Sequence, residues 1–215
     1  MPAAGKTLLL VAALILIGGV AIAGSVVLQR DGGIPDELAD IALAAPVPID
    51  AVSLADANGS VVVPATAREK WTLLALGFTH CPDVCPFMLG NLAEVENRMR
   101  ERLGPAQQPQ FVFLSVDPAR DTPALLAEYV AFFSDDFVGL TGPKSEIDRI
   151  TKQLSAFYRL GPKDSDGDYG VDHSAEIFLI DPKGRLFGKF QPPLDPDDTT
   201  TKFEKALRFF EQSET

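Results

Sequence analysis

The sequence predicts an α/β domain built around a largely buried sheet. Two apolar runs, residues 71–78 (WTLLALGF) and 111–116 (FVFLSV), are typical of strands that are buried on both faces. Between them, apolar residues recur at spacings of four and three over residues 85–103, which indicates a helix. A strand, a helix and a second strand in this order predict a right-handed βαβ unit.

Turn and capping signals predict the other elements. In chain order these are a hairpin over residues 51–63 around Asn58-Gly59, a helix opened by Thr122-Pro123 and ending near residue 133, a short strand at 137–140, a helix over about 143–157, a hairpin formed by 175–180 and 186–190, and a closing amphipathic helix over about 198–210. The stretch between the helix at 143–157 and the strand at 175–180 is predicted to be a polar loop. Together these elements predict a thioredoxin-like sandwich.

The N-terminal segment predicts a membrane anchor. Lys6 and Arg30 are the only charged side chains of residues 1–30, and the 23 residues between them are uncharged and mostly apolar. A helix of about 20 apolar residues spans a bilayer. The alternative is a signal peptide cleaved near Ala21-Ile22-Ala23, but the apolar run continues beyond this site. We therefore expect a cytoplasmic tail at residues 1–6, a transmembrane helix at 7–29, a linker at 30–47 and the folded domain at 48–215.

Charge predicts the orientation of the chain and excludes one class of partner. Lys6, just before the anchor, favours the cytoplasmic side, so the folded domain is expected on the outer side of the membrane. Because the chain has no transit peptide rich in Arg and Ser, we expect a bacterial inner membrane and a domain in the periplasm. The net charge of −11 and the lack of a basic stripe argue against nucleic-acid binding, which relies on clusters of Lys and Arg.

The only two cysteines, Cys81 and Cys85, follow the first buried strand at the start of a helix. Ligands of open α/β sheets bind beyond the carboxyl ends of the strands, and a helix N-terminus lowers the pKa of a thiol. Residues four apart share a helix face, so both sulfurs could converge, with Cys85 facing inward. A disulfide here would close almost no loop, which argues against a purely structural bridge. The three intervening residues depart from the two-residue redox motif, but dithiol–disulfide exchange stays open.

The chain also has only two histidines. His173 precedes the strand at 175–180, in a loop that faces the cysteines across the end of the predicted sheet. Disulfide-exchanging proteins of this fold usually carry a cis-proline there, and this chain has none; a surface histidine without a role is the alternative. His80 beside Cys81 is expected to pack or form hydrogen bonds near the site. Two thiolates and one imidazole suit Cu(I), or Cu(II) with a weak further ligand, whereas zinc would need another ligand.

Several of these segments resemble the Sco/SenC family of copper proteins. The matching residues are Gly77-Phe78-Thr79-His80-Cys81-Pro82-Asp83-Val84-Cys85-Pro86, Ser115-Val116-Asp117-Pro118, Arg120-Asp121-Thr122-Pro123, Val171-Asp172-His173-Ser174 and, more weakly, Asp181-Pro182-Lys183-Gly184. The resemblance covers about residues 47–212. It implies a thioredoxin-like domain on one N-terminal helix, one copper ion held by Cys81, Cys85 and His173, and a role in maturing the binuclear copper centre of cytochrome c oxidase.

Two functions follow from this resemblance. The first is a metallochaperone that takes copper from a periplasmic donor and passes it to the copper-binding subunit of the oxidase, without being an enzyme. The second is a thiol–disulfide reductase that uses Cys81 or Cys85 to keep the oxidase cysteines reduced; a thiol peroxidase or redox sensor is a third, weaker alternative. Motion of the polar loop before His173 could release the ion. Asp117 and Arg120 could line the site or the partner surface, but the end of a strand and an ordinary helix start at Asp121-Thr122-Pro123 explain them more simply. Asp172 could orient His173.

Overall fold

The computed structural model describes residues 33–64 and 69–213 of the 215-residue chain. The cytoplasmic tail predicted at residues 1–6 and the transmembrane helix predicted at 7–29 lie outside the described residues. Within the described ranges, no helix is both long enough and apolar enough to cross a bilayer.

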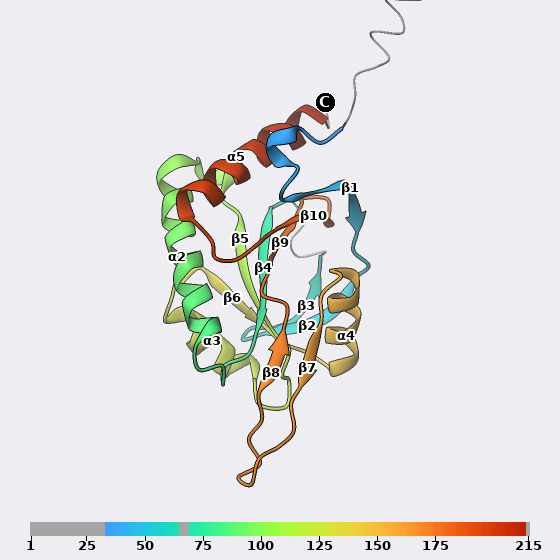
Figure 1. The fold of residues 1–215 in the computed structure, drawn as a ribbon, viewed down its shortest axis with the longest axis vertical. Coiled ribbons are helices and arrows are strands. Elements are labelled where there is room, and N and C mark those ends of the chain that lie inside the picture. Colours follow the sequence, from blue (N-terminus) through green and yellow to red (C-terminus); the bar gives the residue numbers. More distant parts are fainter. Residues whose placement is uncertain (1–32, 65–68, 214–215) are drawn as a thin grey trace, which may run out of the picture. The chain divides into compact units, whose positions relative to one another are not determined.

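A six-stranded sheet forms the centre of the domain, in the order β1-β10-β9-β4-β5-β6 (Figure 1). Strands β4, β5 and β6 run parallel to one another. The pairs β4–β9, β9–β10 and β10–β1 are antiparallel. All six residues of β4 are buried, as the apolar run predicts. The strands are β1 (Ala42–Pro48), β4 (Thr72–Gly77), β5 (Gln110–Ser115), β6 (Phe137–Leu140), β9 (Ile177–Ile180) and β10 (Arg185–Phe190).

Helices cover both faces of this sheet. Successive side chains of a strand point to opposite faces, so each strand contributes to two cores. Leu73 and Phe113 belong to the core formed with α2 (Val84–Arg102), α3 (Pro123–Ala131) and α5 (Pro196–Ser213). Leu74 and Val112 belong to the opposite core, formed with α4 (Lys144–Gln153) and the hairpin of β2 (Val52–Asp56) and β3 (Gly59–Val63). Figure 1 shows α2 and α5 on one side of the sheet and α4 on the other. The predicted two-sided sandwich is therefore confirmed.

The linker predicted at residues 30–47 is wrong for residues 36–47. A short 3-10 helix, η1 (Asp36–Leu38), leads into β1, and Leu38 and Ile41 are buried in the core beside α5. The edge strand β1 has an irregular register with β10 and an irregular burial pattern, so it lacks the alternation by which a strand is recognised. Position 188 must be glycine for β1 to lie this close to β10, since a Cβ there would lie 2.1 Å from the Ile41 carbonyl oxygen.

We expect Leu38→Ala to destabilise the domain, because Leu38 is only 1% exposed and fills the core at the end of the sheet. A buried leucine that is truncated to alanine costs about 2–3 kcal/mol at a site that can partly collapse. Urea unfolding of residues 34–213 would measure the change, with the exposed Val47→Ala as control. An unchanged free energy of unfolding would mean that this segment is a linker after all.

The prediction that residues 158–174 form a polar loop is also wrong. This stretch contains two three-residue strands, β7 (Tyr158–Leu160) and β8 (Val171–His173), which pair outside the main sheet and project from it in Figure 1. The preceding helix α4 is also shorter than predicted and ends at Gln153. Strands this short carry no readable alternation. His173 therefore lies in a paired strand and not in a free loop.

Candidate metal centre

Cys81 and Cys85 lie where β4 passes into α2, at the carboxyl end of the central strand. Both thiols are free; Cys85 is fully buried and Cys81 is half-buried. The inward orientation predicted for Cys85 is confirmed. Gly77 makes room for it, because a Cβ at Gly77 would lie 2.4 Å from the Phe113 ring and 2.9 Å from the Cys85 sulfur.

The sulfurs come together by a route that differs from the expected one. Helix α2 begins at Val84, so Cys81 precedes the helix and the argument from a shared helix face does not apply to it. Instead the Cys81 Sγ accepts a hydrogen bond from the backbone N–H of Cys85, with the two atoms 3.3 Å apart. The first N–H groups of a helix have no acceptor within the helix, and Cys81 fills that role for one of them.

The thiol of Cys85 is not activated by the helix N-terminus. Burial raises the pKa of Cys85 well above its usual value, and a hydrogen bond from the Cys85 thiol to the Cys81 side chain raises it further. Burial disfavours the charged thiolate more than the partial charge of the helix end favours it. The lowered thiol pKa expected at this position is therefore wrong for Cys85. Cys85 keeps its proton at neutral pH unless a bound cation displaces it.

His173 ends β8 and lies against Cys85, as the predicted fold required. Its Nε2 is 3.6 Å from the Cys85 Sγ, and its ring packs edge-on against Phe78 with the ring centroids 6.1 Å apart. Its Nδ1 lies 2.9 Å from the carbonyl oxygen of Ser174, which can only accept a hydrogen bond. This contact assigns the ring proton to Nδ1 and leaves the lone pair of Nε2 directed toward the sulfur.

The spacing of sulfur and nitrogen fits a shared metal ion. Metal bonds of about 2.3 Å to sulfur and about 2.1 Å to imidazole, at angles between tetrahedral and trigonal, separate the two ligand atoms by about 3.6–3.8 Å. The observed distance between Cys85 Sγ and His173 Nε2 is 3.6 Å. The donor set is soft, which suits copper. Within residues 33–64 and 69–213, however, no three side chains of the metal-ligating types already form a closed group. For Cys81 to share an ion with Cys85 and His173, its sulfur would have to turn from the Cys85 N–H.

A buried carboxylate holds the segment before the cysteines. Asp121 accepts hydrogen bonds from the Thr79 N–H at 3.0 Å, the Thr79 hydroxyl at 2.5 Å and the Ser115 hydroxyl at 2.6 Å. His80 is half-exposed; its Nδ1 lies 3.1 Å from the Thr79 hydroxyl and 3.9 Å from Asp121. The expectation that His80 forms hydrogen bonds near the site is confirmed.

A second buried carboxylate, Asp117, contacts the hairpin of His173. It receives hydrogen bonds from Arg120 at 2.5 Å and from the Tyr169 hydroxyl at 2.8 Å. Asp172 does not orient His173 but pairs with Arg159 on the exposed side of the hairpin. Asp117 and Arg120 stand out in the sequence, whereas no local pattern marks Tyr169, because its partner lies 52 residues away.

An apolar hollow gives access to the centre. Cys81 and His173 line it together with Phe78, Val84 and Phe157. Val84 and Phe157 are 55% and 60% exposed, so the hollow presents apolar surface to the solvent. The core thus covers Cys85, whereas Cys81 and His173 face the hollow and are open to the solvent through it.

The chain is similar to proteins of one family. The family model described as SCO1/SenC matches residues 49–208. Over 159 residues, 74% of this chain and 59% of the relative, the chain is 38% identical to the mitochondrial SCO2 homolog of Bos taurus. It spans between half and three fifths of the lengths of the mammalian SCO2 relatives that it matches.

Solved structures agree with this match. The crystal structure of Arabidopsis thaliana ScoI with copper bound is 33% identical, with a TM-score of 0.66. The match covers 76% of this chain and 98% of the ScoI chain. The structure of Bradyrhizobium japonicum ScoI with copper bound is 34% identical, with a TM-score of 0.66, and covers 74% of this chain and 99% of its own. These likenesses confirm the predicted thioredoxin-like fold.

Proposed function

Because the chain belongs to the SCO1/SenC family, we propose that it binds one copper ion and delivers copper to, or helps to mature, the binuclear copper centre of cytochrome c oxidase. In this proposal Cys81, Cys85 and His173 hold the ion as Cu(I) or Cu(II). The copper comes from a periplasmic donor and passes to the copper-binding subunit of the oxidase. The copper bound in the similar ScoI structures supports this assignment.

One observation carries the proposal: Cys85 Sγ and His173 Nε2 lie 3.6 Å apart, although 88 residues separate them in the chain. The Nε2 of His173 is the ring nitrogen that faces Cys85 and can act as a ligand, because Nδ1 is hydrogen-bonded to the Ser174 carbonyl. Cys85 is buried and protonated, so copper uptake must release its proton. Cys81 is the accessible member of the pair, lining the apolar hollow through which thiols of a partner can reach the ion.

The variant His173→Ala tests this function. We expect it to bind copper more than about 100-fold more weakly in an anaerobic titration of the reduced domain, because one of three direct ligands is lost and even a supporting group is worth about 10–100-fold. The control is His80→Ala, which removes the half-exposed histidine on the other side of Cys81 and should bind copper at one ion per chain like the wild type. A His173→Ala variant that still matures the oxidase fully would contradict the proposal.

A thiol–disulfide reductase is the second candidate, and the unequal exposure of the two cysteines favours it. In that reaction the Cys81 thiolate attacks a partner disulfide and Cys85 resolves the mixed disulfide, which leaves a Cys81–Cys85 disulfide and two reduced partner thiols. The buried, protonated Cys85 is unsuited to the first attack. The same His173→Ala variant separates the two functions, because reductase activity does not need the imidazole ligand.

We further propose that the domain faces the periplasm of a bacterial cell on a single-pass inner-membrane anchor. The uncharged, largely apolar residues 7–29 and the preceding Lys6 support this orientation. Alkaline phosphatase is active only outside the cytoplasm, so a fusion after residue 213 should be active. A fusion that is inactive, while a cytoplasmic reporter at the same position is active, would reverse the assigned side.

A further inference from the structure

The hairpin that carries His173 cannot hold its position alone. Its strands β7 and β8 have three residues each and, among the strands that the structure describes, pair only with each other. A two-stranded hairpin of this kind is marginally stable in isolation. At its base the Ser174 N–H donates to the Phe157 carbonyl, and the Phe157 N–H donates to the Ser174 hydroxyl, but these bonds join only its own two arms. Contacts with the body of the domain therefore decide where His173 lies.

Arg120 provides several of these contacts. Its Nη1 donates to the Asp168 carboxylate and its Nη2 to the carbonyl oxygen of Tyr169 at 2.9 Å. The guanidinium carbon lies 3.7 Å from the centroid of the Tyr169 ring. Its Nε is bound to Asp117, and the side chain is only 16% exposed. The planar guanidinium thus holds the loop of the hairpin through an ion pair with Asp168, and through a hydrogen bond and ring stacking with Tyr169.

Asp117 anchors this grip in the body of the domain. It is fully buried at the end of β5 and also accepts the hydroxyl of Tyr169, at 2.8 Å from its Oδ1. Tyr169 lies on the same arm as His173, four residues before it. On the other arm, the Tyr158 hydroxyl donates to Asp148 of α4 at 2.5 Å. Arg120 and Asp117 therefore hold the arm that bears His173 by polar contacts, beside the apolar packing of Val171 against the core.

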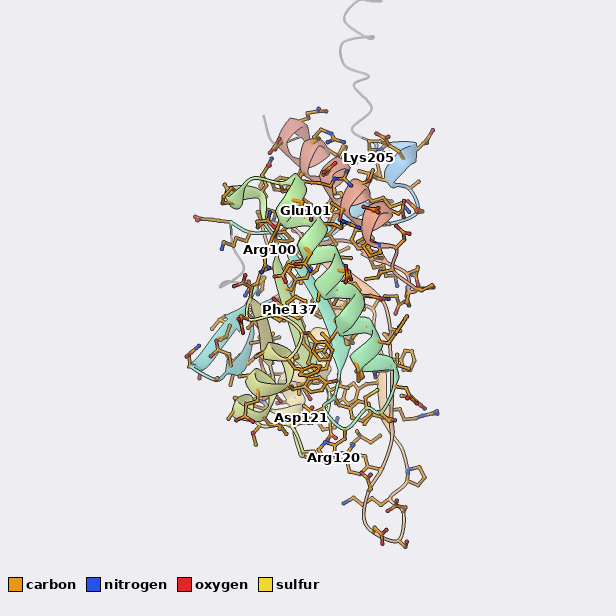
Figure 2. All side chains as sticks on the ribbon, turned by 90° about the vertical axis from the view of Figure 1, so that its left-hand side faces the viewer. Arg100, Glu101, Arg120, Asp121, Phe137 and Lys205 are labelled. Atoms are coloured by element: carbon orange, nitrogen blue, oxygen red, sulfur yellow. The ribbon has the colours of Figure 1, made fainter. Side chains whose placement is uncertain are left out.

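The same short segment also holds the cysteine side of the centre. Asp121 follows Arg120 directly and binds Thr79, two residues before Cys81, through both its N–H and its hydroxyl. Figure 2 places Arg120 and Asp121 together at the end of the domain from which the β7–β8 hairpin projects. One turn of chain after β5 thus touches both halves of the metal centre.

We propose that Arg120 is a positioning residue of this centre: by clamping Asp168 and Tyr169 it keeps His173 beside Cys85, and release of the clamp frees His173 from the site. This inference rests on the proposed copper-binding function for its consequence, but its structural part concerns the hairpin alone. A clamp with one exposed partner, Asp168, can open without unfolding the core. Opening removes the imidazole and leaves the two thiols in place.

The test compares Arg120→Gln with Arg159→Gln, which removes an exposed ion pair from the same hairpin. In the copper-free domain, Arg120→Gln should speed amide hydrogen exchange in residues 158–160 and 171–173 by about tenfold or more. In the copper-loaded domain it should speed copper loss by about 10–100-fold and alter the thiolate-to-Cu(II) absorption band. Arg159→Gln should stay within about twofold of the wild type in both measurements, since exposed pairs contribute little.

A double variant guards against a loss of folding, because Arg120→Gln leaves Asp117 buried without its cation. Asp168→Asn with Tyr169→Phe weakens the clamp on the hairpin side and keeps the Arg120–Asp117 pair; it should raise hairpin exchange in the same residues. Exchange rates and absorption band unchanged in both variants would overturn the inference. A wild type that binds no copper would instead refute the proposed function, while the exchange rates would still decide whether Arg120 positions His173.

Discussion

Cys85→Ser is expected to abolish stoichiometric copper binding while the domain stays folded. The serine hydroxyl has nearly the size of the thiol, so it fits the space between Gly77 and Phe113. It is, however, a hard ligand that remains protonated, and copper prefers the soft thiolate. Losing a direct ligand costs more than losing a supporting group, whose removal weakens metal binding by about 10–100-fold. We therefore expect an affinity loss greater than about 100-fold.

An anaerobic titration of the reduced domain with Cu(I) would measure this loss. Met99→Leu is the matched control, because it removes a fully buried sulfur from the same helix α2, far from the centre in sequence. A volume-conserving exchange of this kind costs less than about 1.5 kcal/mol and should leave copper binding intact. One copper ion bound per chain by Cys85→Ser, at wild-type affinity, would remove Cys85 from the ligand set.

Asp121→Ala is expected to give the largest loss of stability among the substitutions near the centre. Asp121 is 1% exposed, and its two oxygens accept three hydrogen bonds from Thr79 and Ser115. Alanine leaves the buried hydroxyl of Ser115 and the two partly buried donors of Thr79 without this acceptor, at about 1–3 kcal/mol for each group that stays unpaired. We expect a total of about 3–6 kcal/mol, and a displaced Cys81 segment, because Thr79 loses both of its bonds.

Chemical denaturation would measure the free energy of unfolding, and two further variants divide the effect. Asp121→Asn keeps one acceptor oxygen and should cost less than Asp121→Ala. Ser115→Ala removes one donor to Asp121 and also the acceptor of the Asp117 N–H, so it should cost about 1 kcal/mol for each of these two contacts. If Asp121→Ala were no less stable than Asp121→Asn, the three hydrogen bonds would not stabilise the folded state as described.

The long elements of the fold could be predicted from the sequence because their burial repeats at a fixed period. β4, β5 and α2 each have enough residues for an unbroken apolar run or a helical stripe to be visible. β1, β7 and β8 were not predicted as strands. β1 lies at an edge of the sheet and pairs with β10 in an irregular register. β7 and β8 have only three residues each, too few for an alternating pattern to be visible.

The metal centre divides in the same way. The sequence by itself determined the candidate ligand types and the end of the sheet where they gather, since a cysteine pair after a buried strand and a histidine before another meet there in this fold. Only the tertiary structure decided the state of those ligands. Cys85 retains its proton because it is completely buried, and depth of burial depends on the whole core. His173 stands beside it because Arg120 and Tyr169 meet across the fold, a contact between side chains 49 residues apart that no local pattern encodes.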